Sequence, residues 1–162
     1  MDHTFIGATT GFVPTLAIFS GKVADTEGYI GYLPSDESIY VVFRGSESLQ
    51  NWLTDFTTTK TDYTSYPECN CQVHQGFYWA EQAVYPDVLA EVQRLKALYP
   101  TYSVKTTGHS LGGALAFLTQ LDLIKDGYDV NMYNFGQPRA GDKNFAAFAN
   151  LLSRNSFRVV NY

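Results

Sequence analysis

A serine flanked by glycines is the first feature of this sequence that could do covalent chemistry. It lies in TGHSLGG, where Gly108, Ser110 and Gly112 fit the pattern G-x-S-x-G. In the nucleophile elbow that this pattern describes, a tight turn between a strand and a helix exposes the serine hydroxyl, and small neighbouring residues let the strand and the helix approach each other. Ser110 is therefore a candidate nucleophile for acyl transfer.

A serine hydroxyl becomes a good nucleophile only when a base, usually histidine, accepts its proton. In elbow folds the partners follow the serine, first Asp or Glu and then His. The three histidines of this chain, His3, His74 and His109, all precede Ser110. His109 adjoins the serine on the turn, where its side chain should point away from the hydroxyl, and His74 fits a structural, hydrogen-bonding role better. We therefore do not expect the base among them.

The first third of the chain predicts strands separated by turns. Strands are expected at 15–24, 29–33 and 38–43, with turns at DTEG and PSDE between them. Such closely spaced strands indicate an antiparallel start to a sheet. The strand at 38–43 is nearly continuously apolar, as expected of a strand that is covered on both faces.

Beyond the cysteines the hydrophobic period becomes helical. A helix is predicted at 77–98, with Val84, Val88, Val92 and Leu95 along one stripe, and Pro86 should kink this helix or divide it in two. A strand at 102–107, a helix at 111–125, a strand at 131–136, a helix at 143–153 and a strand at 157–162 follow. Strands that alternate with helices are typical of an α/β fold with a parallel central sheet. Ser110 falls between a strand and a helix, as an elbow requires.

The composition favours one folded domain and limits its partners. A chain of 162 residues with 45% hydrophobic and 17% charged residues is typical of a globular domain. The formal net charge of -5, with scattered Lys and Arg, argues against nucleic acid as a partner. The longest apolar run, Phe12–Phe19, is too short to cross a bilayer, and the opening MDHTFIG has no features of a secretory signal.

Cys69 and Cys71 lie in PECNCQVH, separated by one residue. That spacing makes a mutual disulfide geometrically awkward but possible, and two sulfurs without a nearby His or Cys pair do not form a zinc site. Free thiols, a local disulfide and a disulfide to another segment all stay open. No metal site is expected.

Four motifs in consistent order resemble the fungal-type triacylglycerol lipases, the class 3 lipase family of α/β-hydrolases. They read YVVFRGSESLQNWLTDF, VHQGFYWA, KTTGHSLGGALA and YNFGQPRAGD, and the resemblance covers Ile39 to Tyr162. It implies a central, mostly parallel sheet with an antiparallel N-terminal part and flanking helices. It also implies a secreted serine esterase that hydrolyses lipid esters through an acyl-enzyme on Ser110, without a metal or cofactor.

The same resemblance implies roles for other residues. The oxyanion hole would use the backbone N–H of Leu111, and the N–H and hydroxyl of Ser46. The family's acid follows the strand that here reads FRVVNY, so an Asp is expected about two residues beyond Tyr162, with the His further on. We therefore interpret the sequence as an N-terminal lipase portion, inactive alone and with an apolar patch left on its sheet. The acid position is occupied by none of Asp122, Asp126, Asp129 and Asp142.

The segment ESLQNWLTDF predicts an amphipathic helix beside the active site. Its apolar stripe consists of Leu49, Trp52, Leu53 and Phe56, at i, i+3, i+4 and i+7. The pattern alone also fits a stripe packed permanently into the core, but the resemblance places the family's lid here, directly after Ser46. An apolar lid favours a water-insoluble acylglycerol at an oil-water interface as substrate. The alternatives are a feruloyl-type or other carboxylesterase of the family, or a non-catalytic lipid-binding protein if the chain ends at Tyr162.

Overall fold

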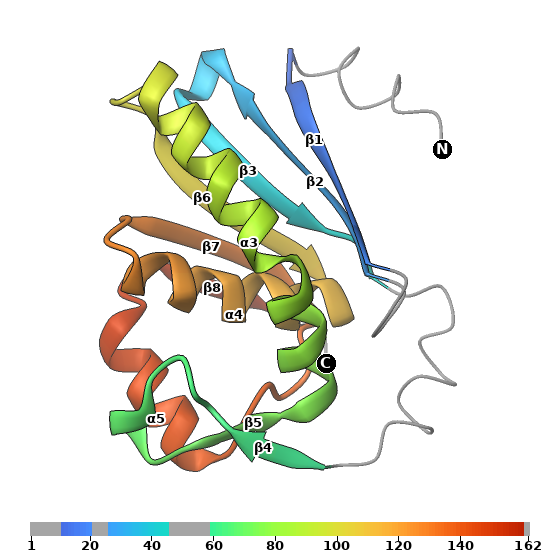
Figure 1. Ribbon diagram of the computed structural model, residues 1–162, viewed down its shortest axis with the longest axis vertical. Helices are drawn as coiled ribbons and strands as arrows, with labels where there is room; N and C mark the ends of the chain where they lie inside the picture. The colour runs from blue at the N-terminus through green and yellow to red at the C-terminus, as the bar shows by residue number, and fades with distance from the viewer. Residues whose placement is uncertain (1–10, 21–25, 46–58, 161–162) are drawn as a thin grey trace.

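The computed structural model describes residues 11–20, 26–45 and 59–160. Its centre is a six-stranded sheet in the order β1-β2-β3-β6-β7-β8 (Figure 1). The strands are β1 (Val13–Ser20), β2 (Thr26–Leu33), β3 (Ser38–Phe43), β6 (Ser103–His109), β7 (Val130–Phe135) and β8 (Ser156–Val159). The first three pair antiparallel, and β3, β6, β7 and β8 pair parallel. The predicted mostly parallel sheet with an antiparallel N-terminal part is confirmed.

The described helices lie on one face of this sheet, in front of it in Figure 1. Helix α3 (Gln75–Leu98) packs against β1, β2 and β3, and helix α4 (Leu111–Lys125) packs against β3, β6 and β7. Helix α5 (Lys143–Leu152) contacts α4. On the opposite face of β3, Tyr40 and Val42 are half-buried. The described residues therefore cover β3 fully on one face only, which is less than its apolar sequence predicts.

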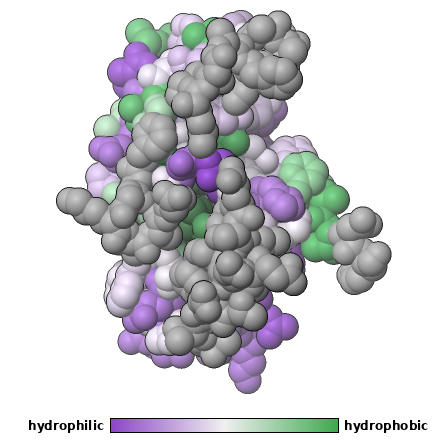
Figure 2. All heavy atoms as spheres, turned by 90° about the vertical axis from the view of Figure 1, so that its right-hand side faces the viewer, coloured by the Kyte–Doolittle hydropathy of each residue, from purple (hydrophilic) through white to green (hydrophobic). Residues whose placement is uncertain are grey.

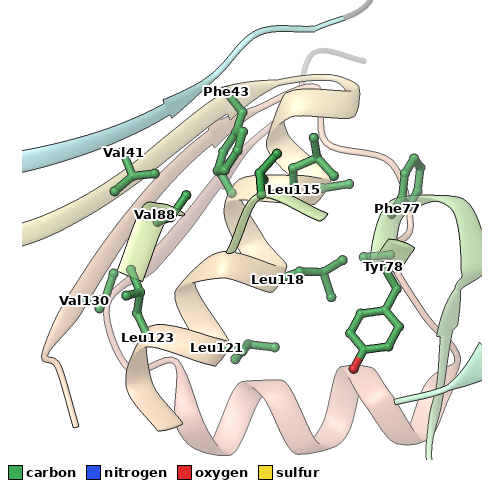
Figure 3. Close-up of a cluster of buried hydrophobic side chains, with 14 of the residues drawn as sticks. Val41, Phe43, Phe77, Tyr78, Val88, Leu115, Leu118, Leu121, Leu123 and Val130 are labelled. Atoms are coloured by element: carbon green, nitrogen blue, oxygen red, sulfur yellow. The ribbon is translucent and has the colours of Figure 1, made fainter. Parts of the chain in front are cut away.

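Helices α3 and α4 form the core with the sheet (Figure 3). The predicted stripe of α3 is confirmed, because Val84, Val88, Val92 and Leu95 are at most 2% exposed. Helix α4 is apolar nearly all round, since the sheet, α3 and α5 enclose it. Its fully buried side chains include Leu115, Leu118 and Leu121. Burial of each such side chain contributes roughly 1.5–3 kcal/mol.

Pro86 lies inside α3 and does not divide it, because the helix runs unbroken from Gln75 to Leu98. The proline ring is on the exposed side of the helix. Proline removes one backbone hydrogen bond, but Val84 and Val88 are buried on either side of it and hold the helix against the sheet. The division into two helices, one of the two predicted outcomes, is therefore wrong.

A two-stranded hairpin, not predicted from the sequence, lies near α5. Strand β4 (Lys60–Asp62) pairs antiparallel with β5 (Gln72–His74). Between them a 3-10 turn, Pro67–Cys69, is followed by Asn70 in the left-handed conformation, with a φ of 46°. This reversal brings Cys69 and Cys71 into a disulfide with a Cα–Cα distance of 5.1 Å. Of the alternatives that the sequence left open, the local disulfide is the one found.

The face of the sheet away from the helices exposes apolar side chains on β7 and β8. Tyr133, Phe135, Phe157 and Val159 are each between 44% and 53% exposed. The register pairs Tyr133 with Phe157 and Phe135 with Val159, and the first pair stacks with ring centroids 5.0 Å apart. Hydrophobic residues also gather at the right-hand edge of Figure 2, which is the side behind the sheet in Figure 1. We call these four side chains the exposed apolar face.

Candidate active site

Ser110 occupies the turn between β6 and α4. Its backbone has a φ of 55° and a ψ of -122°, and it is one of three non-glycine residues with positive φ among those described. Such a conformation costs about 1–3 kcal/mol in a residue with a Cβ atom, so the surrounding contacts must hold it. The Ser110 amide donates to the Phe135 carbonyl at 2.9 Å, and the Ser110 carbonyl accepts from the Ala114 amide at 3.2 Å. The strand, strained turn and helix of an elbow are all present.

Two glycines allow the backbone segments around this turn to touch. A Cβ atom on Gly108 would lie 2.7 Å from the Gly113 amide nitrogen, and a Cβ atom on Gly112 would lie 2.7 Å from the Arg44 carbonyl oxygen. Real Cβ atoms essentially never approach other atoms within 3.0 Å. Glycine is therefore required at both positions, which agrees with the reason for small residues in the G-x-S-x-G pattern.

The end of β3 lies against the same turn. A Cβ atom on Gly45 would come within 2.9 Å of the His109 carbonyl oxygen. Arg44 Nε donates to the Gly45 carbonyl at 3.3 Å, and the Arg44 guanidinium forms an ion pair with Glu27. These contacts hold Gly45 beside the elbow. Ser46 and the predicted lid residues Leu49, Trp52, Leu53 and Phe56 lie outside the described residues, so their roles stay predictions.

Leu111, the second predicted oxyanion donor, is the first residue of α4 and is 2% exposed. The amides of the first helical turn have no acceptor within the helix. Together with the positive end of the helix dipole, these amides favour an anion at this position. The Leu111 N–H is thus placed where it could stabilise negative charge on an oxygen next to Ser110.

His109 is exposed at the top of the elbow. Its ring lies beside two glycines at the ends of neighbouring strands: a Cβ atom on Gly45 would be 3.5 Å from Nδ1, and one on Gly136 would be 3.2 Å from Nε2. Within residues 11–20, 26–45 and 59–160, no hydrogen bond joins His109 to the Ser110 hydroxyl. This arrangement agrees with the expectation that His109 is not the base.

His74 is the last residue of β5 and caps α3. Its Nδ1 accepts the Phe77 amide at 3.4 Å, and its ring packs on the Phe77 ring at 4.1 Å. Partial burial lowers the pKa of the His74 imidazole below its ordinary value. The structural, hydrogen-bonding role predicted for His74 is confirmed. His3 lies outside the described residues.

Comparisons with known proteins agree with this geometry. The family model "Lipase (class 3)" matches residues 40–162, which is most of the chain. The chain belongs to the class 3 lipase family.

Two relatives of this chain are a lipase from Rhizomucor miehei and the secreted mono- and diacylglycerol lipase 1 of Fusarium solani. The first is 38% identical over 135 residues, which are 80% of this chain and 37% of the relative. The second is 36% identical over 148 residues, which are 89% of this chain and 44% of the relative. The chain therefore spans less than half the length of these curated relatives.

Solved structures of fungal lipases place the chain in the α/β-hydrolase fold. Lipase II from Rhizopus niveus superposes with a TM-score of 0.87 at 30% identity, over 95% of this chain and 59% of the other. A lipase from Rhizopus microsporus var. chinensis does so with a TM-score of 0.85 at 34% identity, over 92% of this chain and 53% of the other. A further relative, with a TM-score of 0.86, is a triacylglycerol lipase with a serine protease triad as its catalytic centre; it matches at 34% identity, over 93% of this chain and 57% of its own.

Three of the four aspartates that follow Ser110, namely Asp122, Asp126 and Asp142, have other partners, and the fourth, Asp129, is exposed. Asp126 accepts from the Tyr85 hydroxyl at 2.6 Å, and Asp142 caps α5 by accepting the Phe145 amide at 2.8 Å. Asp122 lies near the far end of α4, about 18 Å along the helix axis from Ser110. These contacts agree with the expectation that none of them is the acid of a triad on Ser110.

Two buried carboxyl groups lie close together between α3 and α4. They belong to Glu81 of α3 and Asp122 of α4. The sequence did not predict this pair, although Asp122, a charged residue inside the apolar run LTQLDLI, was a signal for it. Tyr63, Ser65 and Gln82 donate to Asp122, and Gln82 and Thr119 donate to Glu81, over 2.7–3.3 Å. Desolvation raises the pKa of both carboxyl groups, and the charge of Asp122 raises the pKa of Glu81 further. We place the proton on fully buried Glu81, because three donors stabilise the charge on Asp122.

Two buried amides fix the loop after β7 to the elbow helix. Asn134 Nδ2 donates to the Gly113 carbonyl at 2.7 Å and to Gln137 Oε1 at 2.8 Å. Asn134 is fully buried and Gln137 is 5% exposed. Both residues belong to the motif YNFGQPRAGD, whose individual roles the sequence did not indicate. They position the first turn of α4, and with it Ser110 and Leu111.

In the described part of the chain, no cluster of three or more His, Cys, Asp or Glu side chains could hold a metal ion. None of the helices in those residues is long and apolar enough to cross a membrane.

Proposed function

We propose that this class 3 lipase hydrolyses carboxylic esters of lipids through an acyl-enzyme on Ser110. The observation that carries the proposal is the backbone of Ser110, with a φ of 55° and a ψ of -122° between a parallel strand and a helix. The hydroxyl attacks the ester carbonyl carbon while a base accepts its proton, and the alcohol leaves as the acyl-serine ester forms. Water then hydrolyses this ester, which releases the fatty acid and regenerates the hydroxyl.

The oxyanion of each tetrahedral intermediate would be stabilised by the Leu111 N–H and by Ser46. Two observations support this assignment: Leu111 opens α4, and Gly45, the residue before Ser46, lies within contact of His109. Loss of one such donor costs about 3–4 kcal/mol of transition-state stabilisation. The close approaches at Gly45 and Gly112 hold the end of β3 against the elbow and the first turn of α4.

The acid and the base are proposed to follow Tyr162 in the protein, as the family resemblance implies. The engagement of His74, Asp122 and Asp142 in other contacts supports this proposal. It predicts that the coding sequence after the Tyr162 codon specifies an Asp within a few residues and a His further on. A stop codon directly after Tyr162 would contradict it.

The proposed substrate is a water-insoluble acylglycerol, and the proposed location is extracellular. Relatives at 36% and 30% identity are secreted mono- and diacylglycerol lipases, and the segment predicted as a lid is apolar at positions 49, 52, 53 and 56. The disulfide between Cys69 and Cys71 supports the location, since disulfides persist in oxidising compartments.

The test is hydrolysis of an emulsified acylglycerol, compared with soluble methyl ferulate, by the protein expressed from its whole gene. We expect hydrolysis of the emulsion and a loss of at least about 10⁴-fold in Ser110→Ala. Hydrolysis of methyl ferulate alone would instead indicate a feruloyl-type esterase. A folded wild-type protein that binds the emulsion without hydrolysing any ester would indicate the non-catalytic alternative.

A further inference from the structure

A pocket lies between the β4–β5 hairpin and the beginning of α5. It has a volume of about 620 Å³. Its walls are Lys60, His74, Arg139, Gly141, Asp142 and Lys143. Three separate segments of the chain thus contribute basic side chains to one cavity.

Backbone hydrogen bonds hold the two walls of this pocket together. The His74 amide donates to the Ala140 carbonyl at 2.8 Å, and the Asp142 amide donates to the Gln72 carbonyl at 2.9 Å. Lys60 is paired with His74 in the hairpin. The hairpin and the segment before α5, which carry the basic side chains, are therefore fixed relative to each other.

The pocket carries an excess of positive charge. Lys60, Arg139 and Lys143 are exposed, and in the described part of the chain none of the three forms an ion pair or a side-chain hydrogen bond. The single acid in the wall is Asp142, whose carboxylate already accepts the Phe145 amide. With His74 neutral, three cations and one anion leave two positive charges here, in a protein with a formal net charge of -5.

The elbow after β6 and the beginning of the hairpin lie on the same side of the molecule (Figure 1). The C-terminal ends of β6 and β7 and the Lys60 end of the hairpin all lie on the right-hand side of Figure 1, the side that faces the viewer in Figure 2. The loop after β7 connects the two sites, because it starts at the elbow, where a Cβ atom on Gly113 would be 3.2 Å from Gln137, and reaches the pocket at Arg139. An ester that reaches Ser110 at the end of β6 would therefore lie on the same side of the molecule as the hairpin that lines this pocket (Figure 1).

We propose that this pocket binds the phosphate of an anionic phospholipid and so anchors the protein on an anionic lipid surface. The proposal rests on the proposed function, since an anchor of this kind is useful to an enzyme whose substrate lies in that surface. Lys and Arg make charge-assisted hydrogen bonds to phosphate oxygens, and none of these three cations forms an ion pair with an acid in the described residues. The remaining surface of an acidic protein is repelled by such lipids, so binding should depend on this pocket.

The test measures vesicle binding with Ser110→Ala as the background, so that hydrolysis does not change the vesicles. Phosphatidylcholine vesicles with and without phosphatidylglycerol are compared. The pocket variant carries Lys60→Gln, Arg139→Gln and Lys143→Gln. The matched control carries Arg94→Gln, Lys125→Gln and Arg154→Gln, which change the net charge equally away from the pocket. At about fivefold per cation, we expect the pocket variant to bind phosphatidylglycerol vesicles on the order of 100-fold more weakly than the control.

Equal losses in the two triple variants would overturn the proposal, because net charge alone would then account for binding. Inorganic phosphate serves as a competitor in the protein with an unchanged pocket. If inorganic phosphate binds this pocket as tightly as the vesicles do, the site is a site for free phosphate and the proposed lipid anchor is wrong. Equal melting temperatures of the two variants ensure that folding is not the cause. Hydrolysis of emulsions by protein with Ser110 intact tests the proposed function separately, because vesicle binding needs no catalysis.

Discussion

Replacement of Gly112 by alanine tests whether the contact between α4 and β3 positions Ser110. The added Cβ atom would lie 2.7 Å from the Arg44 carbonyl oxygen and closer still to the Phe43 carbonyl oxygen. Both obstacles are backbone atoms, so no side-chain rotation can relieve them. Because a relaxed carbon–oxygen contact needs about 3.3 Å, the beginning of α4 has to move by roughly 0.5–1 Å away from β3.

The structural cost of Gly112→Ala is moderate and the catalytic cost is large. Overpacking costs about 1–3 kcal/mol, and the helix preference of alanine over glycine offsets about 1 kcal/mol of this. We therefore expect the variant to fold, with its free energy of unfolding lowered by about 0–2 kcal/mol. A displacement near 1 Å of the Ser110 hydroxyl and the Leu111 N–H should lower kcat/KM by about 100-fold.

The assay is hydrolysis of soluble p-nitrophenyl butyrate by the protein expressed from its whole gene, together with a thermal melt. Gly113→Ala is the matched control, because its Cβ atom would lie 3.2 Å from both Gln137 Cβ and the Gly108 carbonyl oxygen, outside the range below 3.0 Å that real Cβ atoms essentially never show. A shift of a few tenths of an ångström relieves these two contacts, so we expect only a small part of the loss. Wild-type kcat/KM in Gly112→Ala, or an equal loss in both variants, would refute the reasoning.

Three further predictions concern stability and solubility. Because burial raises the pKa of Glu81 above its ordinary value of 4.5, the native state holds this proton more tightly than the unfolded state, and stability falls as the pH rises above that value. Glu81→Gln should therefore have a higher melting temperature than the wild type, and the difference should grow between about pH 5 and pH 8. Asp122→Asn weakens three hydrogen bonds and should lower the free energy of unfolding by about 1–3 kcal/mol. A difference in melting temperature for Glu81→Gln that does not change with pH would contradict the placement of the proton on Glu81. Phe157→Ser should reduce self-association measured by light scattering, because Phe157 belongs to the exposed apolar face. The control, Leu151→Ser, changes an exposed side chain on α5 outside this face and should leave self-association unchanged. Equal effects of the two variants would count against a contiguous patch. Loss of the disulfide in Cys69→Ala/Cys71→Ala should lower the free energy of unfolding, measured by chemical denaturation, by only about 1.5 kcal/mol, since the disulfide closes a very short loop. A variant that is unfolded at room temperature would contradict this prediction.

The elements with strong local patterns were predictable from the sequence. The strand Ser38–Phe43 and the helix Leu111–Lys125 have the predicted bounds, because an apolar run between turn residues and a helix start after a glycine turn are local signals. The hairpin of β4 and β5 was not predictable, since three-residue strands show no period. Of the two outcomes predicted for Pro86, division of the helix was wrong, because tertiary packing on both sides of it outweighs one lost hydrogen bond.

The candidate site likewise has parts that were predictable from the sequence and parts that were not. The elbow at Ser110 is encoded within five consecutive residues, so its conformation follows from the pattern G-x-S-x-G. The pair of Glu81 and Asp122 and the cationic pocket each join residues from separate elements, and only the packing of α3, α4 and the hairpin brings them together. The contact of Asn134 with Gly113 is of the same kind, since the Asn134 side chain on β7 donates to a carbonyl of α4, the helix that precedes β7 in the sequence.

The most direct test of the central claim, that Ser110 is an activated nucleophile, is site-resolved labelling with a fluorophosphonate. The protein expressed from its whole gene is treated with the reagent, and the modified peptide is identified by mass spectrometry. We predict rapid labelling of one serine per molecule on the peptide that contains Ser110, no labelling in Ser110→Ala, and undiminished labelling in Ser103→Ala, which changes the first residue of β6, the strand before the elbow. A folded protein whose Ser110 stays unmodified, or whose label lies on another serine, would contradict the account.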